Sequence, residues 1–155
     1  MPLTVKRVTL WRADVENQPG VLSRILEPLA GAGADLQLVM GYRFPATPEH
    51  SAVEVYPVSG RRTTEAATHA GLVASDIPCV LVEGDNRPGF GAQMARALAD
   101  ARINIAFVMA QVIGRRFAAA IGFEHDAAAA EAMKIIRKSG AAAARRPAKR
   151  SARRR

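Results

Sequence analysis

The side chains most able to do chemistry in this sequence are few and far apart. His50, His69 and His125 are the three histidines, and none belongs to an H-E-x-x-H pattern or a comparable metal-binding spacing. The single cysteine, Cys79, lies in the apolar run 77–82 without a cation or a helix start beside it. This setting favours a buried structural thiol over a reactive one. The sequence therefore predicts no catalytic residues, no metal site and no cofactor.

Two loops have the residue types that bind a carboxylate. The pattern Asn-x-Pro-Gly occurs at residues 17–20 and again at 86–89, each time just before a segment with helical periodicity. The first N–H groups of a helix lack intrahelical partners and carry partial positive charge, and a glycine lets a ligand approach them closely. The expected ligand contacts are Asn17, Pro19, Gly20, Val21 and Leu22 in the first loop and Asn86, Gly89, Phe90 and Gly91 in the second.

A polar residue follows each of these two helices. We expect Asp35 to take a ligand ammonium in the first copy. Asn104, at the corresponding place, is the expected ligand contact in the second copy, although it lacks the charge of Asp35. The first copy should therefore hold a free amino acid better than the second. A purely structural interpretation stays open, because Asn-x-Pro-Gly makes a good strand-to-helix turn by itself and Asp and Asn are common turn residues.

The two loops belong to an internal repeat. Residues 17–41 match residues 86–110 at a constant shift of 69, with eight identities in 25 positions. Each copy has the order strand, helix, strand, strand, helix. The expected strands are Val5–Val15, Leu36–Phe44 and Ser51–Val58 in the first copy and Cys79–Glu83, Ile103–Ile113 and Phe117–Phe123 in the second; the expected helices begin at Val21, Arg61, Phe90 and Ala127, the last one capped by Asp126 and stopped by Gly140.

This order predicts an α+β fold of two ferredoxin-like βαββαβ domains, at residues 1–76 and 77–140, whose strands form one continuous sheet. A final strand at Leu72–Ser75 completes the first domain. The second domain has no clear final strand, and that place is either filled by another chain or left as an open edge that favours a dimer. Residues 141–155 are expected to be disordered, because alanine and arginine cannot bury enough apolar area.

The segments Val8–Leu36 and Val80–Ile105 resemble the ACT domain family. The resemblance rests on an apolar strand, a polar loop that ends in Pro-Gly, an amphipathic helix, and an Asp or Asn before the next strand. With two copies it covers most of the chain. The family implies regulatory modules that pair side by side and bind a small ligand, most often an amino acid, at the junction between domains.

Basic residues gather at the C-terminal end. The formal net charge is +8, from 22 Lys and Arg against 14 Asp and Glu, and the residues before 145 are close to neutral. The end segment resembles the flexible basic tails of bacterial histone-like proteins. It is either a solubilising, poorly constrained terminus or a segment that makes sequence-independent contacts with nucleic acid or another acidic partner. Its basic side chains are Arg145, Arg146, Lys149, Arg150, Arg153, Arg154 and Arg155.

Taken together, these features favour a non-catalytic, cytoplasmic regulatory protein that binds an amino acid at the domain junction and signals to a partner. The alternatives are a nucleic-acid-associated protein that acts through its basic tail and a regulatory subunit of an amino-acid biosynthetic enzyme; a homodimer is compatible with each. The sequence has neither a signal-peptide-like start nor an apolar run long enough to span a membrane, so no membrane contact is expected.

Overall fold

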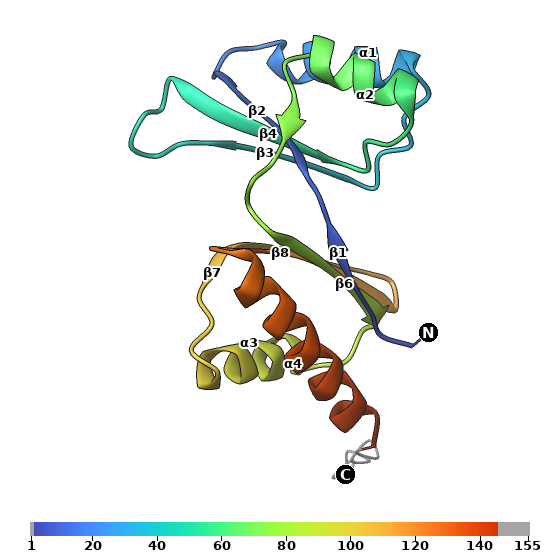
Figure 1. The fold of residues 1–155 in the computed structure, drawn as a ribbon, viewed down its shortest axis with the longest axis vertical. Coiled ribbons are helices and arrows are strands. Elements are labelled where there is room, and N and C mark those ends of the chain that lie inside the picture. Colours follow the sequence, from blue (N-terminus) through green and yellow to red (C-terminus); the bar gives the residue numbers. More distant parts are fainter. Residues whose placement is uncertain (1, 146–155) are drawn as a thin grey trace, which may run out of the picture. The chain divides into compact units, whose positions relative to one another are not determined.

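The structure, a computed structural model, describes residues 2–145, with side chains as far as Ala141. The chain separates into two compact units. The first unit comprises residues 8–76, and the second comprises residues 2–7 and the chain from residue 77 onward. Each unit has a four-stranded sheet with two helices on one of its faces (Figure 1). The expected α+β fold with two βαββαβ domains is therefore confirmed.

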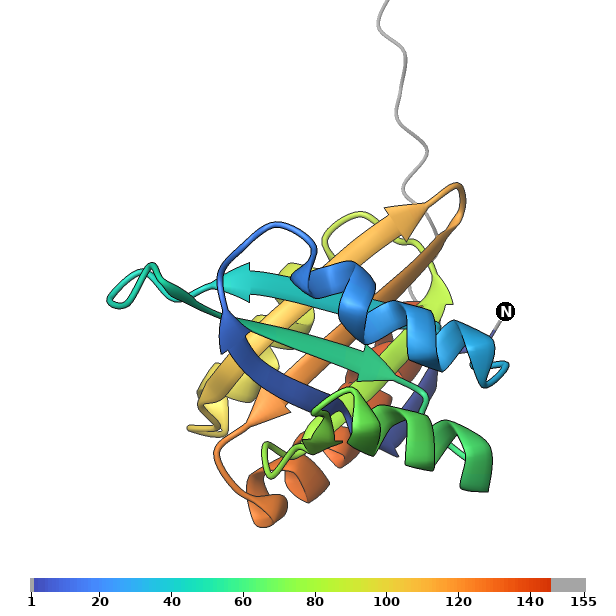
Figure 2. The same cartoon turned by 90° about the horizontal axis from the view of Figure 1, so that it is seen from above.

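The first unit places its core between the sheet and its two helices. Alternation along the sheet turns Val53 and Val55 toward the helices, where they meet Val21, Ile25 and Leu29. Figure 2 shows the two helices lying beside each other across the strands. The strand order is β3-β4-β2-β5, with β2 at Trp11–Glu16, β3 at Leu38–Arg43, β4 at His50–Tyr56 and β5 at Val73–Ala74; the helices are α1 (Val21–Gly31) and α2 (Arg61–His69).

The second unit repeats this plan. Val80, Val82 and Ile121 of its sheet pack against Met94 and Leu98 of a helix, and the Cys79 thiol is fully buried as predicted. The strand order is β1-β6-β8-β7, with β1 at Thr4–Val8, β6 at Cys79–Asp85, β7 at Ile105–Ile113 and β8 at Arg116–Phe123; the helices are α3 (Phe90–Asp100) and α4 (Asp126–Arg145).

The expected single strand Val5–Val15 is wrong. The chain forms β1 up to Val8 and begins β2 at Trp11, and the two strands lie in different sheets. The reason is that the two halves pack into different cores, since Val5 joins the core of the second unit and Ala13 that of the first. The sheets are therefore separate instead of continuous. Residues 2–7 lie with the second unit, although they precede the first in sequence.

The strand that the second copy lacks is supplied by the start of the same chain. In the first unit, β5 is the outer neighbour of β2; in the second unit, β1 is the outer neighbour of β6 (Figure 1). Within the described residues, Lys6 of β1 also forms an ion pair with Glu83 of β6, with 3.6 Å between Nζ and Oε2. The second unit thus has four strands without a contribution from another chain.

The end of α4 also differs from the prediction. Gly140 does not stop the helix, which continues to Arg145. A Cβ at Gly140 would overlap the side chain of Leu3, so this glycine makes room for the N-terminal segment. At the other end, the Ala128 N–H donates to Nδ1 of His125 at 3.1 Å, so His125 is the cap, while Asp126 pairs with Arg7. Of the tail predicted to be disordered, residues 141–145 are helical and 146–155 lie outside the described residues.

Candidate functional site

The first Asn-x-Pro-Gly loop uses several of its polar groups internally. The Asn17 side-chain amide donates to the Pro48 carbonyl at 3.0 Å, which fastens the loop between β3 and β4. The Val21 N–H donates to the Gln18 carbonyl at 3.3 Å. Gly20, with φ of +90°, turns the chain into α1. Two of the groups expected to hold a carboxylate are therefore engaged within the protein.

Asp35 lies far from this loop. Between them runs α1, whose 11 residues span about 16 Å at roughly 1.5 Å per residue. The carboxylate and the ammonium of an amino acid share one carbon, so a single amino acid cannot reach Gly20 and Asp35 of the same unit. Asp35 instead lines a separate cavity of about 240 Å³, together with Gly33, Ala34, Gln37, Pro57, Ser59 and Thr63.

The second loop opens onto a groove, which we call the α3 groove. Three of the residues expected to bind a ligand, Asn86, Phe90 and Gly91, line this space of about 210 Å³ at the start of α3. Gly89, with φ of +82°, turns the chain into the helix just as Gly20 does in the first unit. The remaining lining residues are Arg87, Met94, Ala110, Gln111, Val112, Phe117 and Ala119.

The groove exists because β7 is an edge strand that the helices cover incompletely. Val108 and Val112 pair with Ile121 and Phe117 of β8, which face the core, yet these two valines are 60% and 54% exposed. The apolar side of β7 thus forms one wall and the first turns of α3 form the other. Asn104 does not reach this place, because it follows the far end of α3 and donates from Nδ2 to Glu124 Oε1 at 2.7 Å.

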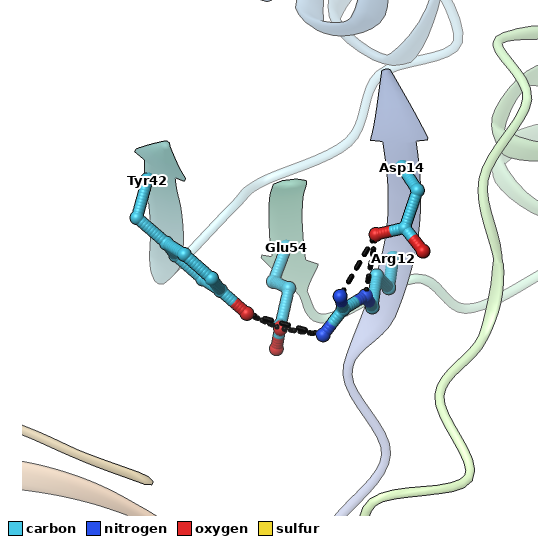
Figure 3. Close-up of polar contacts among 4 residues, drawn as sticks. All are labelled: Arg12, Asp14, Tyr42 and Glu54. Atoms are coloured by element: carbon cyan, nitrogen blue, oxygen red, sulfur yellow. Dashed lines mark hydrogen bonds and ion pairs between the residues drawn. The ribbon is translucent and has the colours of Figure 1, made fainter. Parts of the chain in front are cut away.

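A polar network that sequence analysis did not find spans three strands of the first unit (Figure 3). Arg12 forms an ion pair with Asp14, with 2.8 Å between Nη2 and Oδ1, and a second one with Glu54, with 3.3 Å between Nη1 and Oε1. The Tyr42 hydroxyl donates to the same Glu54 oxygen at 2.8 Å. Glu54 is fully buried, and its Oε2 has no hydrogen-bond partner among the described residues.

The network keeps the Tyr42 hydroxyl and the Arg12 guanidinium protonated. Burial and the hydrogen bond to Glu54 raise the pKa of Tyr42 to about 12. Burial lowers the pKa of Arg12, but the hydrogen bond to Asp14 and the nearby Tyr42 and Glu54 outweigh it, so the pKa is raised. Such groups do not exchange protons near neutral pH, which argues for a structural role over acid–base catalysis. Only the strand register, which places Arg12 opposite Glu54, reveals the network.

In the part of the chain that the structure describes, three or more His, Cys, Asp or Glu side chains nowhere gather as metal ligands would. None of the helices in that part combines the length and the apolar character needed to cross a bilayer. Of the predicted nucleic-acid contacts, Arg145 is the last residue of α4, and the other six lie outside the described residues.

Several solved structures have this fold. Protein BT0572 from Bacteroides thetaiotaomicron superposes with a TM-score of 0.70 at 15% identity, covering 84% of this chain and 88% of that one. The regulatory subunit of aspartate kinase from Thermus thermophilus, in its ligand-free form, has a TM-score of 0.59 at 19% identity, covering 90% and 97%. That of Thermus flavus has a TM-score of 0.55 at 18% identity, with the same coverage.

These likenesses lie in structure alone. No protein-family model matches the sequence, and no curated protein matches it either. At identities below 20%, the superpositions establish the fold. The chain therefore has the tandem ACT-type fold that its repeated strand–loop–helix segments resemble.

Proposed function

We propose that this chain is a non-catalytic regulatory protein that binds an amino acid in the α3 groove. The observation that carries the proposal is the meeting of Asn86, Phe90 and Gly91 with the exposed side of β7 around one space. These three residues were expected at a ligand site from sequence alone. The first-turn N–H groups of α3 provide partial positive charge there.

The groove offers a polar end and an apolar end. Asn86 and Arg87 supply an amide and a guanidinium, which suit a carboxylate and its neighbouring polar groups. Met94 and Val112 supply apolar surface for a side chain. The proposal therefore assigns binding to the second copy of the loop. In the first copy, the Asn17 amide is already engaged and Asp35 lies at the other end of the helix.

The regulatory part of the proposal draws on the structural likeness. Two of the superposed proteins are regulatory subunits of aspartate kinase, and we propose a similar role for this chain, in the cytoplasm and on a partner enzyme. The edge position of β7 leaves a place where a second copy of the chain can pair beside the groove. A bound ligand regulates only if it binds two arrangements of the protein with different affinity.

Isothermal titration of the full chain with each proteinogenic amino acid tests the proposal. Gly91→Leu is the informative variant, because Gly91 has ordinary helical backbone and a Cβ there meets open space, so the added side chain fills the groove without strain. Gly20 is less suitable, since its φ of +90° strains any substitution. Ala92→Leu, an exposed position of the same helix outside the groove, is the matched control.

The proposal expects one amino acid, or a small chemical class of them, to bind the wild type and Ala92→Leu alike. Affinity should fall at least tenfold in Gly91→Leu, since a leucine side chain takes up much of a space of about 210 Å³. Equal affinity in both variants would place the ligand elsewhere. A panel without any binding would contradict the ligand-binding function itself.

A further inference from the structure

The second unit contains another cavity, of about 310 Å³, which we call the N-terminal cavity. It shares Arg87, Phe90 and Phe117 with the α3 groove, and its other walls come from segments far apart in the sequence. The segment that precedes β1, the end of β6 and the C-terminal half of α4 all contribute. These other lining residues are Pro2, Leu3, Gly84, Asp85, Arg137, Gly140 and Ala141.

The floor of the cavity is apolar and closely packed. Leu3 fits between two glycines, because a Cβ at Gly84 would lie 3.4 Å from Leu3 Cδ1 and one at Gly140 would overlap the same side chain. Phe90 and Phe117 complete the floor as a tilted aromatic pair, with 5.5 Å between ring centroids. A hydrocarbon group placed here would therefore meet a leucine side chain and the two aromatic rings.

Among the described lining residues, the rim of the cavity has two cations and one carboxylate. The Arg137 side chain is oriented, because its Nη2 donates to the Val5 carbonyl of β1 at 2.8 Å. A guanidinium has five N–H donors, so others stay available for a ligand. Arg87 adds a second guanidinium. Asp85 is the single carboxylate of the lining and already interacts with another group.

We propose that the N-terminal cavity binds an apolar monocarboxylate, a small organic acid that carries a hydrocarbon group and lacks an ammonium. Arg87 and Arg137 hold its carboxylate through charge-assisted hydrogen bonds, and Leu3, Phe90 and Phe117 receive its hydrocarbon part. A cavity of about 310 Å³ is at the small end of ligand pockets, which limits the ligand to a compact molecule. The excess of guanidinium groups at the rim repels an ammonium.

This site adjoins the one proposed for the amino acid and shares Arg87, Phe90 and Phe117 with it, but it takes a different chemical class. Its test uses 3-phenylpropanoate as the probe, titrated into the full chain by calorimetry. Three control compounds separate the contributions: 3-phenylpropanamide lacks the charge and inorganic phosphate lacks the apolar part. The third, phenylalanine, adds an ammonium and is titrated into Gly91→Leu, in which the α3 groove is filled. The expected result is binding of 3-phenylpropanoate at least tenfold tighter than any of the three.

Two variants place the probe in the N-terminal cavity. Arg137→Gln removes the charge while keeping a polar side chain, and the affinity should fall about tenfold. Ala141→Glu puts a carboxylate at an exposed helical position of the rim and should weaken binding by at least as much. Lys138→Gln, on the same helix but outside the lining, should leave the affinity unchanged. Thermal unfolding of each variant checks that the fold is kept.

The Gly91→Leu variant separates this proposal from the previous one. It fills the α3 groove and should leave the affinity for 3-phenylpropanoate unchanged, since Gly91 does not line the N-terminal cavity. If Gly91→Leu no longer bound 3-phenylpropanoate, the probe would be placed in the groove and the proposal overturned. The proposal would also be overturned if the amide, phenylalanine or phosphate bound as tightly as the probe, or if the probe did not bind at millimolar concentration. Unchanged affinity in folded Arg137→Gln and Ala141→Glu would overturn it as well. None of these results alters the amino-acid titration.

Discussion

The two units place different chemistry at the same point of the same fold. In the first unit, Arg12 of β2 pairs with Glu54 of β4. In the second unit, the corresponding pair of β6 and β8 is Leu81 and Ala120. The repeat shift of 69 residues relates Arg12 to Leu81. The backbone thus accepts either a charged or an apolar pair at this point, so the repeated fold alone does not determine what each unit does.

The outer strands differ as well. In the first unit, β5 has two residues and Val73 is 64% exposed. In the second unit, β1 has five residues and buries Val5 in the core, while its leading segment lines the N-terminal cavity. An outer strand that comes from the start of the chain therefore gives the second unit both stability and a cavity wall. The following substitutions test how far these differences matter.

The largest effect is expected from Arg12→Leu, which gives the first unit the leucine that the second unit has at the corresponding position, Leu81. The change leaves the buried Glu54 without its cation and should destabilise this unit by about 3 kcal/mol. The measurement is urea unfolding followed by the amide signals of residues 8–76, because the two units need not unfold together.

Arg12→Leu combined with Glu54→Ala then recreates the whole apolar pair of the second unit. This double variant should recover most of the lost stability, because no buried charge is left alone. A single variant that loses less than about 1 kcal/mol would show that the network contributes little.

A second comparison uses glycines of the two sheets. A Cβ at Gly122 of β8 would overlap the Phe107 ring, whereas a Cβ at Gly41 of β3 would make an ordinary contact, 4.0 Å from the Ala52 carbonyl oxygen. Gly122→Ala should therefore cost about 2 kcal/mol, and Gly41→Ala should be close to neutral. Chemical denaturation monitored separately for each unit gives both values. Similar losses at both positions would argue against the close packing of Phe107.

The outer strands give a third comparison, with a smaller effect. Val5→Ala removes two buried methyl groups from the core of the second unit and should cost about 1.5 kcal/mol. Val73→Ala alters an exposed position of β5 and should change stability by less than about 0.5 kcal/mol. Amide hydrogen exchange in β6 and β2, their respective neighbours, reports the two effects. The reverse order would mean that β1 is not an integral strand of the second unit.

The smallest effect concerns alkaline pH. Because the pKa of Tyr42 is raised to about 12 from the ordinary value of 10, the folded first unit keeps a proton that the unfolded chain loses. The stability that the first unit gains from keeping the Tyr42 proton is complete below pH 10 and is lost as the pH rises toward 12. Tyr42→Phe should weaken this alkaline loss of stability, measured by urea unfolding at several pH values. An unchanged slope in that variant would assign the effect to another group.

Sequence reasoning succeeded where the information was local. Helical spacing at residues 21, 25 and 29 identified α1, and alternation over residues 117–123 identified β8. The loop residues Asn86, Phe90 and Gly91 could be singled out together because they lie within six residues of one another. Their convergence with Ala110–Val112 depends on how β7 and α3 pack, which the pattern does not contain.

The errors arose where distant segments meet. The alternation of Val5–Val15 is equally good in one strand or in two, so it does not show that the chain changes sheets at Thr9 and Leu10. Gly140 was taken as a helix stop because glycine is common there, whereas its role is to admit Leu3. The Arg12–Glu54 pair and the N-terminal cavity depend on such long-range neighbours as well.

The central claim is that the second unit, and not the first, receives the amino acid. The most direct test is a backbone amide NMR titration of the full chain with the amino acid that calorimetry selects. Saturable shifts at residues 86–91 and 110–112, with residues 17–22 unchanged, are the predicted result. Shifts confined to residues 17–22 or to the surroundings of Asp35 would contradict the claim and assign binding to the first unit.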